Sequence, residues 1–328
     1  MTSGLEFVGP ELDADIRAGL DAVESMLRAS VKSEYPFVTE TSQHLLTAGG
    51  KRFRPLLVLL AAQFGDPQAA GVVPAAVVVE LTHLATLYHD DVMDEAVLRR
   101  GAPAANARWG NTVAILTGDF LFARASDILA DLGPEAVRLQ ARTFERLVQG
   151  QIRETVGPED GEDPVAHYLR VLGDKTGSLI GTSGRFGAML SGADGSATDV
   201  LTRYGERIGV AFQLSDDLLD VTADREELGK TPGTDLREGV ATLPVLLLRR
   251  EARAEDGELL ERLDGNLDDD DALAAAVTAL RAHPILADAR REVQRWADDA
   301  RATLSALPDG PAKAALEGLC DYVVRRTG

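Results

Sequence analysis

The chain has 328 residues, of which 45% are hydrophobic and 5% aromatic, and its formal net charge is −19. This length can bury a sizeable core, and the abundance of Ala, Leu and Val favours packed helices over a β-sandwich. So acidic a chain lacks the basic surface that nucleic-acid phosphates require, although metal ions or a local group of cations can still hold a small anion.

Neither the cysteine content nor the apolar runs indicate a secreted or membrane-spanning protein. Cys320, the one cysteine, cannot form an intrachain disulfide, and no set of Cys and His suggests a zinc site. The acidic stretch 1–20 contains Gly and Pro and does not read as a signal peptide. The apolar runs 56–62 and 72–81 are shorter than the ~20 residues of a membrane span. We expect a cytoplasmic protein with no transmembrane segment.

Apolar periodicity and loop-forming residues predict ten or more helices along the chain. They cover 11–31, about 74–98, 111–132, 134–156, 165–172, 174–192, 198–222, 242–252, 271–281, 285–306 and 311–326. No period-2 stretch with hairpin turns indicates a strand. The predicted fold class is therefore all-α, with a single domain, 1–328, that forms a large helical bundle with a central cavity. Residues 1–10 are expected to be poorly ordered.

Two acidic motifs of the form DDxxD interrupt strongly apolar sequence, 216 − 90 = 126 residues apart. They consist of Asp90, Asp91 and Asp94, and of Asp216, Asp217 and Asp220. On a helix the first and last aspartates of a motif lie on one side, where their charges repel unless a hard cation binds among them. Carboxylate oxygens suit Mg²⁺. Two such clusters that face each other are expected to hold several Mg²⁺ ions and, through these ions, a diphosphate.

For several charged residues, solvation, helix capping or surface charge is an alternative to a functional role. A single DDxxD motif can be a solvated helix face, but the second copy in apolar sequence disfavours this. The run 268–271, DDDD, precedes an Ala-rich helix, and helix capping with solvation explains it. His89 adjoins the first motif, where we favour a packed or solvated histidine. For Arg325 and Arg326 we favour surface charge over closure across the site.

Basic residues gather near the acidic motifs, which is unexpected in so acidic a chain. They are Lys51, Arg52 and Arg54 in GGKRFRP (49–55), His83, Arg99, Arg100, Lys175 with its neighbour Thr176, and Lys230. Arg binds phosphate oxygens through paired hydrogen bonds, and Lys acts as a point charge. The group therefore indicates anion sites, while ordinary ion pairing on the surface is the alternative for any one member.

These motifs closely resemble those of the trans-isoprenyl diphosphate synthases, or polyprenyl synthetases. The resemblance covers about 49–244 and rests on GGKRFRP, HLATLYHDDVMD with RRG, DKTGSL, FQLSDDLLD and GKTPGTDLREG, in family order. It implies an all-α bundle, usually a homodimer, which agrees with the periodicity. It also implies an Mg²⁺-dependent prenyltransferase that joins isopentenyl diphosphate head-to-tail to an allylic diphosphate, with peripheral membrane contact when the product is released.

The resemblance implies a role for each matching residue. Three Mg²⁺ ions are expected at Asp90, Asp94 and Asp216, with support from Asp91, Asp217 and Asp220. The diphosphate of isopentenyl diphosphate is expected at Lys51, Arg54, His83 and Arg100. The allylic diphosphate is expected at Arg99, Lys175, Thr176, Gln213 and Lys230, and Lys175, Thr176 and Gln213 join Asp90, Asp94 and Asp216 as catalytic residues. Val240 stands where the family often has Lys, which removes one cationic contact.

Product length is expected to depend on the helix before Asp90, because the growing chain enters the apolar space beneath it. The residues implied as gates are Ala85 and Thr86, and one turn deeper Leu81 and Thr82. Ala85 and Thr86 are small where short-chain members carry bulky aromatics, so we predict a product longer than geranylgeranyl diphosphate. Tyr88 is the residue that can narrow this passage.

Three alternatives stay open. The first is a short-chain synthase that makes farnesyl or geranylgeranyl diphosphate. The second is a class I terpene cyclase, but a cyclase needs no second diphosphate site, so the cations at 51, 54, 83 and 100 argue against it. The third is a non-catalytic regulatory subunit, which typically lacks motif aspartates that are complete here.

Overall fold

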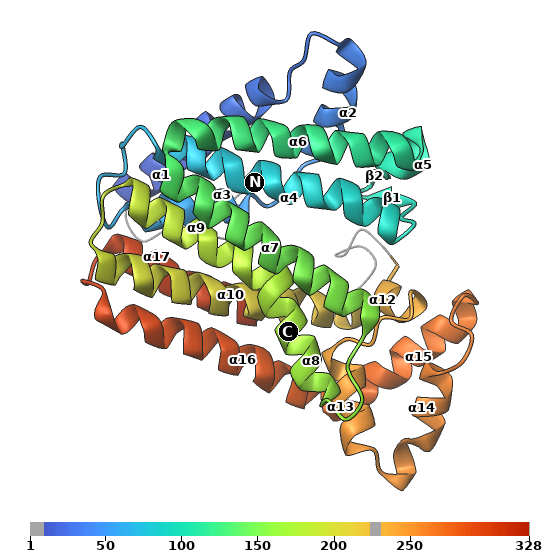
Figure 1. Ribbon diagram of the computed structural model, residues 1–328. Helices are drawn as coiled ribbons and strands as arrows, with labels where there is room; N and C mark the ends of the chain where they lie inside the picture. Colours follow the sequence, from blue (N-terminus) through green and yellow to red (C-terminus); the bar gives the residue numbers. More distant parts are fainter. Residues whose placement is uncertain (1–9, 224–230, 328) are drawn as a thin grey trace. The chain divides into compact units, whose positions relative to one another are not determined.

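The computed structural model describes residues 10–223 and 231–327 and confirms the all-α fold class (Figure 1). Lys230 and residues 1–9, on which expectations were placed above, lie outside the described residues. The helices are α1 (Pro10–Ser30), α2 (Pro36–Thr47), α3 (Phe53–Ala62), α4 (Val72–Met93), α5 (Ala105–Trp109), α6 (Asn111–Leu132), α7 (Pro134–Val156), α8 (Pro164–Leu172), α9 (Ser178–Leu190), α10 (Gly195–Thr222), α12 (Thr234–Arg237), α13 (Leu243–Glu251), α14 (Gly257–Leu263), α15 (Asp270–Ala282), α16 (Ile285–Thr303) and α17 (Pro311–Arg325). Short 3₁₀ turns lie at Ala254–Asp256 and Leu304–Ala306, and a π turn lies at Gly173–Gly177.

The described chain divides into two compact units. Unit 1 comprises the chain up to Glu145, Leu179–Gly205 and Thr303–Gly318, and unit 2 comprises Arg146–Ser178, Glu206–Ala302 and the chain from Leu319 onward. Helices α7, α9, α10, α16 and α17 contribute residues to both units. The single-domain organisation stays a prediction.

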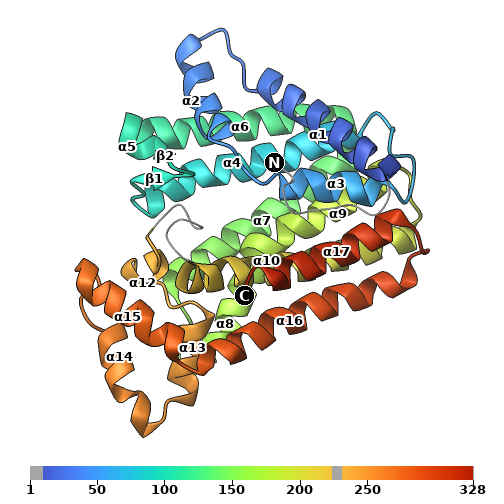
Figure 2. The ribbon, with the colours of Figure 1, turned by 180° about the vertical axis from the view of Figure 1, so that it is seen from behind.

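The core of unit 1 is built around α4, which is apolar on nearly every side. It packs along α6 and against α3 and α1, and both ribbon views show α4 and α6 side by side (Figures 1 and 2). Gly118 permits this close approach, because a Cβ there would lie 2.3 Å from Nε2 of His89 and 3.0 Å from the carbonyl oxygen of Ala85. By length and composition α4 is the one described helix able to cross a membrane, but 67% of that window is buried inside the protein, as in a core helix.

The end of α4 differs from the prediction, which extended this helix to about residue 98. The helix ends at Met93, and Glu95 adopts a left-handed backbone with φ of 50°. A short antiparallel pair follows, β1 (Leu98–Arg99) with β2 (Ala102–Pro103), so the prediction of no strand was also wrong at this place. The turn at Arg100 and Gly101 has φ of 54° and 76°, the positive values that tight hairpin turns require.

In unit 2, α8 packs on α13 and α14 packs on α15. The side chain of Asp269 accepts a hydrogen bond of 2.8 Å from the backbone N–H of Ala272 at the start of α15. The prediction that the acidic run at 268–271 caps a helix is therefore confirmed.

Candidate active site

The first aspartate cluster, Asp90, Asp91 and Asp94, lies at the carboxyl end of α4 in unit 1. Asp91 is fully buried, and its carboxylate accepts hydrogen bonds from Nε of Arg99 at 2.6 Å and from the backbone N–H of Ala105 at 3.3 Å. It therefore fixes the β1–β2 hairpin to the helix. Asp94 is 45% exposed, with its carboxylate 3.6 Å from Nη2 of Arg99, and Asp90 is half-buried. Asp90 and Asp94 are thus the accessible carboxylates of this cluster.

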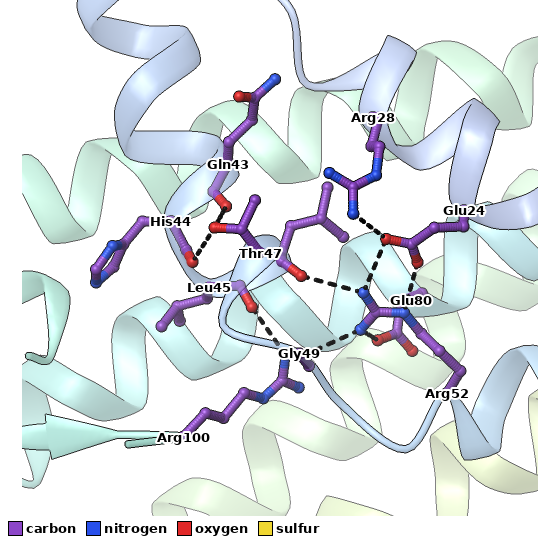
Figure 3. Close-up of polar contacts among 11 residues, drawn as sticks. Glu24, Arg28, Gln43, His44, Leu45, Thr47, Gly49, Arg52, Glu80 and Arg100 are labelled. Carbon is purple, nitrogen blue, oxygen red and sulfur yellow. Dashed lines mark hydrogen bonds and ion pairs between the residues drawn. The ribbon is translucent and has the colours of Figure 1, made fainter. Parts of the chain in front are cut away.

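Arg100, the next residue of the hairpin, serves a different part of unit 1. Arg99 ends β1 and lies among the aspartates, whereas Arg100 lies in the turn, with φ of 54°, and its side chain reaches the segment between α2 and α3. There its Nη1 donates to the carbonyl oxygens of Gly49 and, at 3.0 Å, of Leu45 (Figure 3). One hairpin therefore connects the first aspartate cluster to the GGKRFRP loop.

His83 lies among the positive charges of this region. Burial, followed by the charges of Arg54 and Arg100, holds its pKa well below the ordinary value. The imidazole is therefore neutral at pH 7 and able to donate one hydrogen bond. Lys51 in the loop is exposed, and Arg54 in the first turn of α3 is half-buried. The four residues predicted to hold one diphosphate, Lys51, Arg54, His83 and Arg100, all belong to unit 1.

The second aspartate cluster, Asp216, Asp217 and Asp220, lies on α10 in unit 2. Asp217 is buried and accepts hydrogen bonds from the hydroxyl of Tyr168 and, at 2.8 Å, from Nε2 of Gln213. Asp220 is also buried, and its Oδ2 accepts from the backbone N–H of Asp235 at 3.0 Å. Asp216 is the partly exposed member. As in the first cluster, buried carboxylates that accept hydrogen bonds lie beside an accessible one.

Lys175 and Thr176 lie in the π turn that precedes α9, a distortion that often marks functional positions. Gly150 of α7 lies against it, because a Cβ there would come within 2.6 Å of the backbone nitrogen of Lys175. The hydroxyl of Thr176 donates to Oε1 of Gln213 at 3.3 Å. Lys175 forms an ion pair with Glu154. A chain of side chains therefore runs from Thr176 through Gln213 to the second aspartate cluster.

At the second cluster one residue was missed in the sequence and another was misinterpreted. Tyr168 gave no signal, because nothing in its neighbourhood on the chain links α8 to α10. The interpretation of Arg326 as surface charge is wrong, because its side chain is only 12% exposed and forms an ion pair with Asp216. Its guanidinium also lies over the ring of Phe212, 4.8 Å from the ring centre. An arginine directly after the apolar end of α17 is the signal that could have indicated this contact.

The donor chemistry of the two clusters fits a hard divalent cation. Among residues 10–223 and 231–327, no three His, Cys, Asp or Glu side chains already converge as a metal site. Each cluster nevertheless offers accessible carboxylate oxygens, and in each a guanidinium, Arg99 or Arg326, lies against them. The accessible carboxylates therefore lie beside positively charged groups in both clusters. Carboxylate oxygens of this kind suit Mg²⁺ as ligands.

The residues predicted to control product length lie in the interior of unit 1. Leu81, Thr82 and Ala85 are fully buried and Thr86 is half-buried. The hydroxyl of Thr82 donates to the carbonyl of Val78 and accepts from Nε2 of Gln140 on α7, both at 2.8 Å. This pair is a polar contact within an otherwise apolar interior.

Tyr88 and Val240, which were also singled out in the sequence, lie in a buried and an exposed position, respectively. Tyr88 is fully buried, and its hydroxyl donates to the carbonyl of Thr41 and accepts from the N–H of Leu45 at 3.2 Å, so this side chain is fixed against α2. Val240 is 44% exposed in the loop after α12. Arg237, the nearest described arginine in sequence, forms an ion pair with Asp270.

Protonation of Asp217 gives a testable pH dependence. Burial raises the pKa of this carboxyl to about 6 from 3.8, despite the hydrogen bonds from Tyr168 and Gln213. The folded state then binds the proton more tightly than the unfolded state, so stability falls as pH rises from about 4 through 6, by roughly 3 kcal/mol in total. We expect Asp217→Asn to raise the Tm of metal-free protein at pH 8 more than at pH 5, measured by differential scanning fluorimetry in EDTA. An equal shift at both pH values would contradict this.

Comparison with known proteins places these observations in context. A family model described as polyprenyl synthetase matches residues 35–280. The chain is 48% identical to nonaprenyl diphosphate synthase of Mycobacterium tuberculosis over 329 residues, covering 100% of this chain and 98% of that protein. A geranylgeranyl pyrophosphate synthase structure from Corynebacterium glutamicum, complexed with calcium and isoprenyl diphosphate, has a TM-score of 0.88 and 46% identity over 98% of this chain and 99% of that one. A decaprenyl diphosphate synthase structure from Rhodobacter capsulatus has a TM-score of 0.87 and 34% identity over 97% and 99%.

Proposed function

Since this chain belongs to the polyprenyl synthetase family, we propose how its residues carry out isoprenyl diphosphate synthesis and which product they make. The chain is an isoprenyl diphosphate synthase, so the predicted reaction class is confirmed. Enzymes of this family use isopentenyl and allylic diphosphates together with a divalent metal.

In this proposal both aspartate clusters bind metal for the same reaction. Asp90, Asp94 and Asp216 hold three Mg²⁺ ions, and the buried Asp91, Asp217 and Asp220 keep the surrounding backbone in place. When bound, Mg²⁺ neutralises the diphosphate that leaves the allylic substrate. The supporting observation is the arrangement within each unit, where an accessible carboxylate stands beside buried ones that are hydrogen-bonded to the backbone or to neighbouring side chains.

The remaining polar residues divide between the two substrates. Arg99, Lys175 and Lys230 donate to the allylic diphosphate, and Thr176 and Gln213 face the allylic cation that forms. Lys51, Arg54, His83 and Arg100 hold the diphosphate of isopentenyl diphosphate, so that its double bond attacks this cation. A proton is then lost to the departing diphosphate, and no protein base is required. The apolar surroundings of the aspartates keep water from the cation.

We further propose a long-chain product, a homodimer and a cytoplasmic location. The relationship to nonaprenyl and decaprenyl synthases supports a product longer than geranylgeranyl diphosphate, and so do the small side chains of Ala85 and Thr86. Side chains of Ile115 and Leu116 on α6 are 42% and 60% exposed, which favours a covered face in a dimer. A long apolar product requires peripheral contact with a membrane on release.

The experiment that tests the function is turnover by purified protein. We expect incubation with Mg²⁺, isopentenyl diphosphate and several allylic diphosphates to give products longer than twenty carbons after dephosphorylation and sizing. Turnover is expected to stop with EDTA and to return with excess Mg²⁺. A twenty-carbon product would indicate the short-chain alternative, and turnover of an allylic diphosphate alone would indicate a cyclase. Inactivity with both substrates would indicate a regulatory subunit.

A further inference from the structure

Arg52 belongs to the GGKRFRP loop but not to the set of cations assigned to a diphosphate. Its backbone is left-handed, with φ of 50°, directly before α3. Its side chain is only 10% exposed and turns into the protein (Figure 3). A buried arginine beside an anion site either binds the anion or shapes the site, and its contacts distinguish these roles.

The guanidinium of Arg52 is surrounded by acceptors from several parts of unit 1. Its Nε donates to Glu24 of α1 and its Nη1 to Glu80 of α4, both at 3.0 Å. Two backbone carbonyls complete the set, with Leu46 at 3.2 Å from Nη2 and Gly49 at 3.3 Å from Nη1. One planar group therefore ties α1 and α4 to the loop that carries Lys51.

The charge of Arg52 is already compensated inside this cluster. Glu80 is 3% exposed, and a carboxylate so deeply buried requires a cation beside it. Glu24 also pairs with Arg28 at 3.0 Å, so two arginines balance two glutamates. A diphosphate would have to displace these carboxylates to bind Arg52.

The backbone held by Arg52 is also held by Arg100. The Nη1 atom of Arg100 donates to the same carbonyl oxygen of Gly49. A Cβ on Gly50, whose φ is 147°, would lie 2.7 Å from Nη1 of Arg52 and 3.0 Å from Nη1 of Arg100. The absence of a side chain at Gly50 thus allows the guanidinium groups of Arg52 and Arg100 to pack against the same backbone segment.

We propose that Arg52 is a positioning residue, which Glu24 and Glu80 hold in place so that it fixes the loop over residues 48–52, between α2 and α3, without contacting substrate. The fixed loop carries Lys51, leads into Arg54 at the start of α3, and accepts a hydrogen bond from Arg100 of the hairpin, so it positions all three cations for the diphosphate of isopentenyl diphosphate. This inference rests on the proposed function. It identifies Arg52 as a residue that controls the affinity of the enzyme for isopentenyl diphosphate.

The test is the KM for each substrate in variants of the full chain. Arg52→Met combined with Glu80→Gln removes one buried charge of each sign and leaves the Glu24–Arg28 pair intact, so we expect the variant to fold. Displacement of a positioned group by about 1 Å can reduce catalytic efficiency by up to about 100-fold. We therefore expect the KM for isopentenyl diphosphate to rise at least about 10-fold. The KM for the allylic diphosphate is expected to stay within about twofold, and Tm measures folding.

A second pair of variants separates positioning from direct binding. If Arg52 bound the diphosphate, Glu80→Gln would release its charge and lower the KM for isopentenyl diphosphate, and Arg52→Lys would largely retain affinity. Positioning predicts that both variants raise this KM, because an ammonium group cannot bond four acceptors in the plane of a guanidinium. The control is Arg185→Gln, which breaks a 3.7 Å ion pair with Asp199 in the same unit and should change neither KM.

The inference and the proposed function fail in different ways. Wild-type protein without turnover on isopentenyl diphosphate would contradict the proposed function. Wild-type turnover with unchanged KM values in the double variant, or with an equal rise for both substrates, would overturn the role of Arg52 alone. A lower KM in Glu80→Gln would overturn it as well.

Discussion

Replacing Asp90 by Asn is expected to lower kcat/KM about 10³-fold, and replacing Asp216 by Asn is expected to have an effect of the same size. Each change keeps the shape of the side chain but removes the negative charge that holds a divalent cation. Loss of several kcal/mol of electrostatic stabilisation of the departing diphosphate corresponds to this factor. Steady-state kinetics at saturating Mg²⁺ measures it.

The control for these variants is Asp268→Asn. Asp268 is an exposed member of the acidic run before α15, to which no catalytic role is assigned. Its replacement should leave kcat/KM within about twofold, since surface substitutions of this kind are usually close to neutral. Asp90→Asn protein that is folded and retains more than a tenth of wild-type kcat/KM would contradict the metal-ligand role.

Replacing Ala85 by Phe is expected to shorten the product by several isoprene units. Ala85 is fully buried on α4, one turn before the first aspartate cluster, and an aromatic ring there occupies space that the growing chain is proposed to enter. Overpacking of a filled core costs about 1–3 kcal/mol, so Tm is expected to fall while activity on short allylic diphosphates persists. Chromatographic sizing of the dephosphorylated products measures the change.

A graded variant makes this test sharper. Ala85→Leu adds less volume than Ala85→Phe, so its product should be intermediate in length. Active protein with an unchanged product in both variants would remove Ala85 as the gate and would direct attention to Thr86, which is half-buried on the same helix.

Much of the fold was predictable because helical periodicity is a local property. The predicted boundaries 111–132 and 134–156 coincide with α6 and α7. The prediction was wrong after Met93, where the hairpin depends on two contacts that periodicity does not report. These are the hydrogen bonds of the buried Asp91 to Arg99 and to the N–H of Ala105.

The candidate site was predictable where spacing on one helix decides which side a residue faces. Asp90 and Asp94 are one turn apart, and both are accessible. The roles of Arg52, Tyr168 and Arg326 were not predictable, because each depends on partners far away in the sequence. Arg52 reaches Glu24 and Glu80, Tyr168 reaches Asp217, and Arg326 reaches Asp216.

The measurement that tests the account most directly is a crystal structure of the full chain with Mn²⁺ and a non-hydrolysable allylic diphosphate, with the metal located by anomalous scattering. The account predicts Mn²⁺ ions within about 2.4 Å of carboxylate oxygens of Asp90, Asp94 and Asp216, with one diphosphate bound to all of the ions. Metal ions at only one aspartate cluster, or a diphosphate that binds without metal, would contradict it.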